Sequence, residues 1–309
     1  MAGLKDVTEV ALKLPKLKFK QYYILCKPNV VFLIIFTAIV GMLLSTPGAL
    51  PLVKFLAASI GIGLAAASGA ALNHWVDQRI DLIMERTQNR PLPQGELTTT
   101  SALTFALSLA VISMAILVTW VNTLTAILTL TSLIGYAVVY TMFLKRTTSQ
   151  NIVLGGAAGA APPLLGWTAM TGEINTEALL LFLIIFVWTP PHFWALAIKR
   201  KDEYAKAGLP MLPVTHGIMF TKLHILLYTI LLLIVSIMPF IIFMNGIIYL
   251  AGAITLGLGF LYHVVKLYRT GNTDEHAMKT FGYSIFYLSA LFAFFLLDHY
   301  ARIVLRLFM

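Results

Sequence analysis

Three oxygen-bearing side chains recur at four-residue spacing near the end of a long apolar stretch. They are Asn73, Asp77 and Asp81, and in a helix this spacing keeps them on one face, with a drift of about 40° per step. Three oxygens on one face suit a hard cation such as Mg²⁺, which binds through a few carboxylates together with the phosphates of a substrate. The alternative is that the aspartates only solvate a helix end, paired with nearby arginines.

The residues that follow favour the first interpretation. Arg86 and Arg90 come directly after the acidic face, and the forked guanidinium group matches the geometry of phosphate. Acids and arginines held this close, without cancelling one another, predict a shared polyanion. We expect a metal ion on one side of that polyanion and guanidinium groups on the other.

Two more basic clusters follow other apolar stretches. Lys145 and Arg146 form the first, and Lys199-Arg200-Lys201 form the second. Either they reflect the general excess of cations on the inner side of a membrane protein, or they contact the substrate. Tyr140, about one turn before Lys145, is either an aromatic residue of the membrane interface or a side chain that steadies a phosphate or a cation.

The second basic cluster also contains an acidic point. Asp202 is followed by Glu203, and with Asp77 it could hold a second metal ion. A single Asp-Glu pair in a basic loop is more often a solvated ion pair, and that alternative stays open.

One histidine stands in an unusual setting, in the run Thr189-Pro190-Pro191-His192-Phe193-Trp194. Two prolines should kink a helix, open space beside it and free backbone carbonyls. Surrounding aromatic residues are typical of a pocket for a large ligand, so His192 is a candidate contact. His216, in the polar stretch that follows, is a second candidate.

The elements that position these residues must be membrane helices. Of the 309 residues, 59% are hydrophobic and only 11% are charged, with a mean hydropathy of +0.86. The apolar stretches are continuous rather than alternating, which excludes a barrel of strands, and each is long enough, at about 20 residues, to cross a bilayer. We predict an all-α integral membrane protein with nine transmembrane helices, at about 25–46, 52–73, 101–121, 123–143, 152–171, 177–197, 219–242, 246–266 and 282–304.

The positive charge has a topological explanation. All of the 22 Lys and Arg residues except Lys54, Arg302 and Arg306 fall on one side of these stretches. The rule that basic loops stay inside therefore predicts a cytoplasmic N-terminus, an outer C-terminus and no role for nucleic acid in the net charge of +9. We expect a bacterial cytoplasmic membrane protein, with residues 1–22 as a cytoplasmic tail and 23–309 as the membrane domain.

Two of the long inner loops resemble one another, because Arg90-Pro91-Leu92-Pro93 is matched by Leu209-Pro210-Met211-Leu212-Pro213. This predicts two four-helix repeats, at about 25–143 and 152–266, followed by a ninth helix.

Together these features predict an enzyme that binds a diphosphate at the cytoplasmic rim and an apolar tail within the bilayer. An allylic prenyl diphosphate fits, because metal and arginines stabilise the departing diphosphate while aromatic faces shelter the carbocation. The residues alone do not specify the acceptor. A transporter is the alternative class, but transporters usually place ionisable residues near the midplane, where these stretches have none.

Several motifs resemble the UbiA superfamily of membrane prenyltransferases and, within it, the haem-farnesylating enzymes. They are Asn73-x3-Asp77-x3-Asp81, Glu85-Arg86-Thr87-x2-Arg90-Pro91-Leu92-Pro93, Leu25-Cys26-Lys27-Pro28, Tyr140-Thr141-x3-Lys145-Arg146, Gly155-Gly156-Ala157-Ala158-Gly159, Pro191-His192-Phe193-Trp194 and Pro210-Met211-Leu212-Pro213. The resemblance implies nine helices around a lipid-facing cavity. It also implies Mg²⁺-dependent transfer of farnesyl from farnesyl diphosphate to a vinyl group of haem b, with addition of water, to give haem O for a haem A synthase or a terminal oxidase.

The resemblance also implies roles for individual residues. It places Asn73, Asp77 and Asp81 at the metal and diphosphate, with Tyr140 nearby, and it places the haem beside His192 and His216, next to Trp194, with Lys199 as a contact for its propionates. Direct diphosphate contacts would come from Arg86, Arg90, Lys145 and Arg146. Members that use aromatic quinone precursors, the nearest alternative function, usually carry a second aspartate-rich motif where this chain has only Asp202 as a metal candidate.

Overall fold

The structure is a computed structural model that describes residues 19–46 and 48–307, and within these ranges every regular element is helical. Residues 1–18 of the predicted tail lie outside the described part, while residues 19–22 already belong to the first helix. The elements are α1 (Phe19–Leu25), α2 (Pro28–Leu44), α3 (Leu52–Asp81), α4 (Thr99–Trp120), α5 (Thr123–Ile134), the π-helical segment η1 (Gly135–Leu144), α6 (Lys145–Thr147), α7 (Asn151–Thr171), α8 (Thr176–Lys199), α9 (Lys201–Lys206), α10 (Leu212–Thr215), α11 (Ile218–Ile241), α12 (Ile247–Arg269) and α13 (Ala277–Leu307).

The predicted membrane spans are confirmed by the lengths and composition of these helices. Eight described segments are long and apolar enough to cross a membrane, and the pair α1 and α2, bent by 54° at its break, makes a ninth. The break follows from sequence, because Pro28 disfavours an α-helical residue before it. Lys27 there has a φ of 47° and starts the turn.

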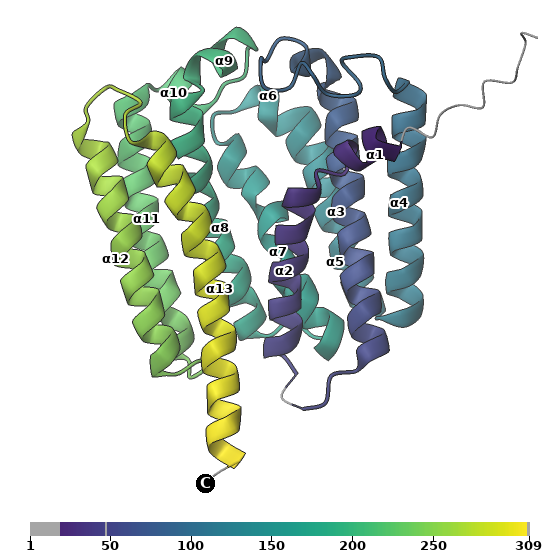
Figure 1. The fold of residues 1–309 in the computed structure, drawn as a ribbon, viewed down its shortest axis with the longest axis vertical. Coiled ribbons are helices and arrows are strands. Elements are labelled where there is room, and N and C mark those ends of the chain that lie inside the picture. Colours follow the sequence, from purple (N-terminus) through teal and green to yellow (C-terminus); the bar gives the residue numbers. More distant parts are fainter. Residues whose placement is uncertain (1–18, 47, 308–309) are drawn as a thin grey trace, which may run out of the picture.

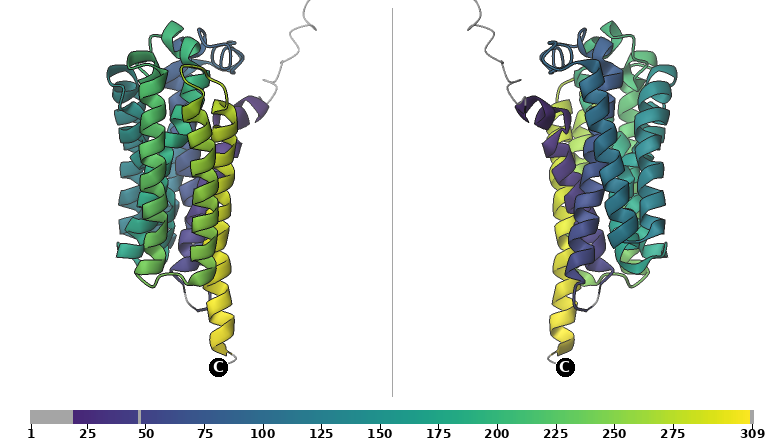
Figure 2. Two further views of the ribbon diagram at one scale, coloured as in Figure 1. Left: turned by 90° about the vertical axis from the view of Figure 1, so that its left-hand side faces the viewer. Right: turned by 90° about the vertical axis from the view of Figure 1, so that its right-hand side faces the viewer.

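The long helices stand side by side (Figures 1 and 2), and their contacts, followed from one helix to the next, close into a ring. α3 packs on α4, α7 packs between α2 and α8, and α11 packs between α8 and α12. The last long helix, α13, contacts α12, α8 and also α2. Because α13 meets α2, the first and last spans complete the ring and enclose a space between them.

Glycines set the closest approach within this ring, where α2 crosses α7. A Cβ atom on Gly41 would collide with the carbonyl of Pro163, and one on Gly166 would collide with the carbonyl of Ala38. Small residues allow membrane helices to approach to this separation. The helical conformation of α7 continues through Pro162-Pro163, and that of α8 continues through Pro190-Pro191.

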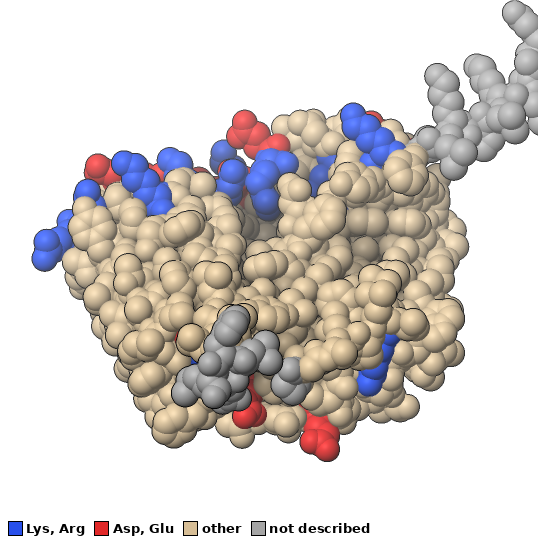
Figure 3. Space-filling model, turned by 60° about the horizontal axis from the view of Figure 1, so that its bottom comes forward, with Lys and Arg blue, Asp and Glu red and all other residues tan. Residues whose placement is uncertain are grey.

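Charged side chains gather along one rim of the molecule, and the belt below it is almost entirely uncharged (Figure 3). The basic rim, as we call this end, comprises the chain segments 82–98, 145–150, 200–217 and 270–276, which connect the helices there (Figure 1). Large apolar side chains such as Val111 and Trp120 on α4 are exposed on the outside of the belt. This surface suits contact with lipid chains rather than water.

Candidate active site

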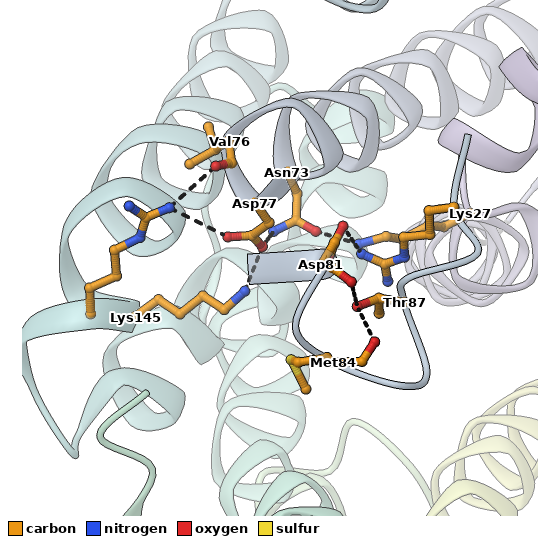
Figure 4. A network of polar contacts seen from close by, with 10 residues as sticks. Lys27, Asn73, Val76, Asp77, Asp81, Met84, Thr87 and Lys145 are labelled. Carbon is orange, nitrogen blue, oxygen red and sulfur yellow. Dashed lines mark hydrogen bonds and ion pairs between the residues drawn. The ribbon is translucent and has the colours of Figure 1, made fainter. Parts of the chain in front are cut away.

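The acidic face is built by a single helix. α3 runs unbroken from Leu52 to Asp81, so Asn73, Asp77 and Asp81 lie on one face as predicted, with exposures of 5%, 1% and 3%. The Asn73 side-chain amide donates a hydrogen bond of 2.8 Å to Asp77 Oδ2. Asn73 and Asp77 are therefore linked directly, and Asp81 follows one turn later on the same face (Figure 4).

Basic side chains from other elements are paired with this surface. Lys145, the first residue of α6, donates to Asp77 Oδ2 at 2.5 Å, and Arg90 donates to Asp81 Oδ2 at 2.7 Å. Arg146 reaches to within 3.9 Å of Asp77 Oδ1 and also donates to the backbone carbonyl of Val76 at 3.2 Å. The prediction that acids and arginines lie together without cancelling is wrong, because buried carboxylates cost several kcal/mol unless they are paired.

The loop after α3 folds back to bring Arg90 to Asp81. The hydroxyl of Thr87, which is buried, donates to the backbone carbonyl of Asp81 at 3.1 Å. A turn from Thr87 to Arg90 then returns the chain toward the helix end, with a backbone hydrogen bond of 3.0 Å between these two residues. Arg86 is exposed at the rim.

Lys27 also belongs to this cluster. It stands in one of the sequence motifs, but no role is predicted for it there. Its ammonium group donates to Asn73 Oδ1 at 2.5 Å. The left-handed turn before Pro28 places it there, on a segment far from α3 in sequence. The run Leu25-Cys26-Lys27-Pro28 could have indicated this position, because the proline disfavours a helical conformation at the lysine before it. With Lys27, Arg90, Lys145 and Arg146 set against two carboxylates, the cluster has an excess of positive charge and suits an anion.

An apolar cavity of about 590 Å³ opens beside this cluster, between α2, α3, η1, α7, α8 and α13. Lys27 and Tyr140 are in its lining, and so is His192. The Tyr140 ring packs over Gly155 of α7, where any side chain would collide with it. Pockets of a few hundred Å³ with apolar walls and few polar groups are typical of sites for small molecules and cofactors.

His192 stands on the α8 side of this cavity, opposite the α3 side. Its ring stacks between Trp188, at 4.2 Å between centroids, and Phe281 of α13, at 4.6 Å. Its Nδ1 lies 2.7 Å from the hydroxyl of Ser284. The structure thus places the predicted haem contact on the same cavity as Tyr140 and as Lys27, which bonds to Asn73 of the acidic face.

Four other predicted residues lie away from both the cluster and the cavity lining. Trp194 is fully buried against His224 and Tyr228, and His216 is exposed, stacked on Phe220. The remaining two lie at the rim, where Lys199 is paired with Asp274 at 2.7 Å and Asp202 is exposed on α9.

Two pKa values at the rim are shifted by their surroundings. The hydrogen bond from Lys199 holds the pKa of Asp274 below its usual value. Burial raises the pKa of the Tyr204 hydroxyl on α9. Across residues 19–46 and 48–307, no three His, Cys, Asp or Glu side chains are grouped closely enough to hold a metal ion by themselves.

The fold and site define a class of membrane protein. Residues 34–297 match the model of the UbiA prenyltransferase family. A digeranylgeranylglyceryl phosphate synthase superposes with a TM-score of 0.77 at 20% identity, covering 91% of this chain and 98% of the other. A UbiA homologue from Archaeoglobus fulgidus, bound to DMAPP and Mg²⁺, superposes with a TM-score of 0.61 at 16% identity, covering 89% and 99%.

Relatives of known name narrow the class. The protoheme IX farnesyltransferase of Thioalkalivibrio sulfidiphilus is 63% identical over 93% of this chain and 95% of its own length. That of Nitrosococcus oceani is 60% identical over 91% and 94%. The chain therefore belongs to the UbiA prenyltransferase family and, within it, to the protoheme IX farnesyltransferases.

Proposed function

We propose that this protein transfers a farnesyl group from farnesyl diphosphate to a vinyl group of haem b, with addition of water, giving haem O and diphosphate. The observation that carries the proposal is the 63% identity to a protoheme IX farnesyltransferase along almost the whole chain. The paired acidic and basic cluster at the mouth of an apolar cavity supports it, since a prenyl diphosphate needs both environments in contact.

The residues of the acidic face fit a divalent metal ion. Asp77 Oδ1 is buried and lacks a hydrogen bond, and every ligand that Asn73, Asp77 and Asp81 offer is an oxygen, as Mg²⁺ prefers. The A. fulgidus homologue, which shares the fold, binds Mg²⁺ together with a prenyl diphosphate. In this protein Asn73, Asp77 and Asp81 would hold Mg²⁺, which supplies positive charge to offset the charge of the diphosphate.

The basic side chains bind the diphosphate directly and stabilise its negative charge. Arg90, Lys145 and Arg146 exchange part of their pairing with the aspartates for the phosphate oxygens, and Lys27 and the exposed Arg86 close the site from the rim. When the bond between C1 of farnesyl and its oxygen breaks, the electron pair leaves with the diphosphate. Preorganised donors stabilise that charge without having to reorganise.

The cavity binds the farnesyl chain and shelters the allylic cation. Tyr136 and Tyr140, stacked at 5.7 Å between centroids, line the cavity close to the cluster and present aromatic faces to the positive charge. Gly69, Gly155 and Gly159 also line it and leave room for the methyl branches of the chain.

The acceptor approaches from the side of α8 and α13. The terminal carbon of the haem vinyl group supplies its π electrons to C1 of the farnesyl cation and forms the new carbon–carbon bond. The cation left beside the porphyrin takes up water, which loses a proton to solvent, so that a hydroxyl group remains. His192 and its aromatic neighbours hold the haem during this step. Lys199 and His216 lie at the rim beyond α8, and Trp194 packs behind His192 against His224 and Tyr228.

The remaining expectations complete the proposal. The basic rim faces the cytoplasm of a bacterial cell and the C-terminus lies outside, as the charge distribution favours. Two four-helix repeats, at about 25–143 and 152–266, and a second metal contact at Asp202 belong to the same proposal. Haem O then passes to a haem A synthase or a terminal oxidase in that membrane.

A competition for the acceptor tests this proposal. Purified protein receives Mg²⁺ and farnesyl diphosphate labelled in the farnesyl group, with haem b and 4-hydroxybenzoate present together. We expect the label to enter the porphyrin alone, with release of one diphosphate per farnesyl transferred. Label in 4-hydroxybenzoate would instead assign the quinone-precursor reaction, and no release of diphosphate would exclude prenyl transfer.

A further inference from the structure

A chain of two hydrogen bonds, through three residues, fixes which ring nitrogen of His192 carries the proton. The Ser284 hydroxyl donates to the backbone carbonyl of Phe281, one turn earlier in α13, at 2.6 Å. Two oxygens this close would repel without a proton between them, so the single hydroxyl proton lies there. The hydroxyl oxygen must therefore accept the hydrogen bond from His192 Nδ1 at 2.7 Å, and Nδ1 carries the ring proton.

In the neutral imidazole, the other ring nitrogen is therefore an electron-pair donor. His192 Nε2 has no hydrogen-bond partner among the described residues. Unlike both ring nitrogens of His74, it is not sealed inside the protein. Since His192 lines the cavity, the lone pair of Nε2 opens toward that space.

The position of the ring is fixed as firmly as its tautomer. Trp188 and Phe281 stack on its two faces with interplanar angles of 17° and 25°. The indole nitrogen of Trp188 also donates to the backbone carbonyl of Ser284 at 2.8 Å, which ties α8 to α13 beside the imidazole. The hydrogen bonds to Ser284 join residues more than ninety positions apart in sequence, so they tie two helices together rather than lying within one helix.

A neutral imidazole whose Nδ1–H is held by a second group, with Nε2 free, is the usual arrangement of a metal-binding histidine. We propose that Ser284 is a positioning residue, which sets the tautomer and angle of His192 so that Nε2 binds the iron of the haem substrate. This inference rests on the proposed function. It adds how the haem is held, because one axial bond would anchor the porphyrin while its vinyl edge turns toward the prenyl chain.

The test is a haem titration of purified Ser284→Ala without farnesyl diphosphate, followed by steady-state kinetics. Loss of a group that orients a metal-bound histidine lowers metal affinity by about tenfold to a hundredfold. We expect haem to bind more weakly by this factor and the KM for haem to rise by the same factor. The Soret band should be altered, and the KM for farnesyl diphosphate should be unchanged. Ser284→Thr, which keeps the hydroxyl, should restore the Soret band.

A matched control removes a different buried serine hydroxyl. Ser236 of α11 bonds to the hydroxyl of Tyr287 at 2.7 Å and lies outside the cavity lining, so Ser236→Ala should keep the Soret band of the original protein. A further variant, His192→Gly, should lose that band and recover it when free imidazole is added.

The outcomes separate the inference from the proposed function. If Ser284→Ala binds haem with the original affinity and spectrum, the positioning role is overturned while farnesyl transfer by the unmodified protein still stands. If His192→Gly keeps the original spectrum, iron binding by this histidine is overturned. If the unmodified protein adds no farnesyl to haem, the proposed function itself fails.

Discussion

Replacing Asp77 by asparagine removes one charge from the centre of the cluster and keeps the shape of the side chain. Asp77 is 1% exposed, and its carboxylate is in contact with Lys145 at 2.5 Å and with Arg146 at 3.9 Å. Asp77→Asn therefore weakens the proposed site for the divalent cation and leaves Lys145 without its buried partner. We expect turnover to fall sharply while haem binding is retained, because His192 is held by α8 and α13.

The size of the effect follows from the charges. Two unit charges about 4 Å apart contribute about 4 kcal/mol at the effective dielectric constant of about 20 that suits such sites. At about 1.4 kcal/mol per tenfold change in rate, this corresponds to a loss of about a thousandfold in kcat. Breaking a buried ion pair also costs about 3–5 kcal/mol of folding stability. We expect the lower end here, since the Lys145 side chain is 15% exposed and retains some water.

The assay compares diphosphate release per molecule of folded protein, with the Soret band of bound haem as the measure of folding at the acceptor side. Asp298→Asn is the matched control. Asp298 is equally buried, but at the far end of α13, where it accepts hydrogen bonds from the backbone amides of Gly246 and Tyr249 at the start of α12. This control should lower the melting temperature and leave kcat unchanged.

An Asp77→Asn protein with at least a tenth of the original kcat would refute the reasoning. Neutralising a carboxylate that binds both the metal ion and the basic side chains should lower kcat by far more than tenfold. A matching loss in Asp298→Asn would show instead that the assay reports general damage to the fold.

Three more changes test other parts of the site and fold. Arg90→Ala removes a charge-assisted hydrogen bond of about 1.5–3 kcal/mol, so KM for farnesyl diphosphate should rise about tenfold to a hundredfold in steady-state kinetics; unchanged kinetics would remove this arginine from the site. Gly166→Ala places a methyl group against a backbone carbonyl of α2 and should lower the free energy of unfolding by about 1–3 kcal/mol, measured as a lower melting temperature. In the control Gly282→Ala, the added methyl group meets nothing within 4 Å, so the melting temperature should not change. Ile62 is the cavity-lining residue of α3 furthest from Asp77, about 22 Å along the helix at 1.5 Å per residue; Ile62→Ala should increase the use of geranylgeranyl diphosphate relative to farnesyl diphosphate, and an unchanged ratio of products would show that chain length is set elsewhere.

The sequence was sufficient for features that depend on local periodicity. The nine spans follow from apolar stretches of membrane length, and the shared face of Asn73, Asp77 and Asp81 follows from their spacing on one helix. The cavity prediction combined these with proline and aromatic residues near His192. The same periodicity argues against Trp194 as a cavity residue, because two residues along a helix turn the side chain by about 200°, and the structure places it on the opposite face.

Partners across the ring could not be read from the sequence. Many cations occupy the rim, and only the packing of η1 and of the turn before α2 selects Lys145 for Asp77 and Lys27 for Asn73. The Ser284 hydroxyl was likewise unremarkable in an apolar stretch, because its importance depends on α13 returning beside α8. Side chains that come together only through tertiary contacts have no regular spacing in the sequence from which their pairing could be predicted.

The most direct test is the mass of the haem after incubation of the purified protein with haem b, farnesyl diphosphate and Mg²⁺. The expected result is a haem whose mass has increased by one farnesyl group and one hydroxyl group, formed only when all three components are present. Haem b recovered with its mass unchanged, from a preparation that still binds haem and releases diphosphate, would contradict farnesyl transfer to haem.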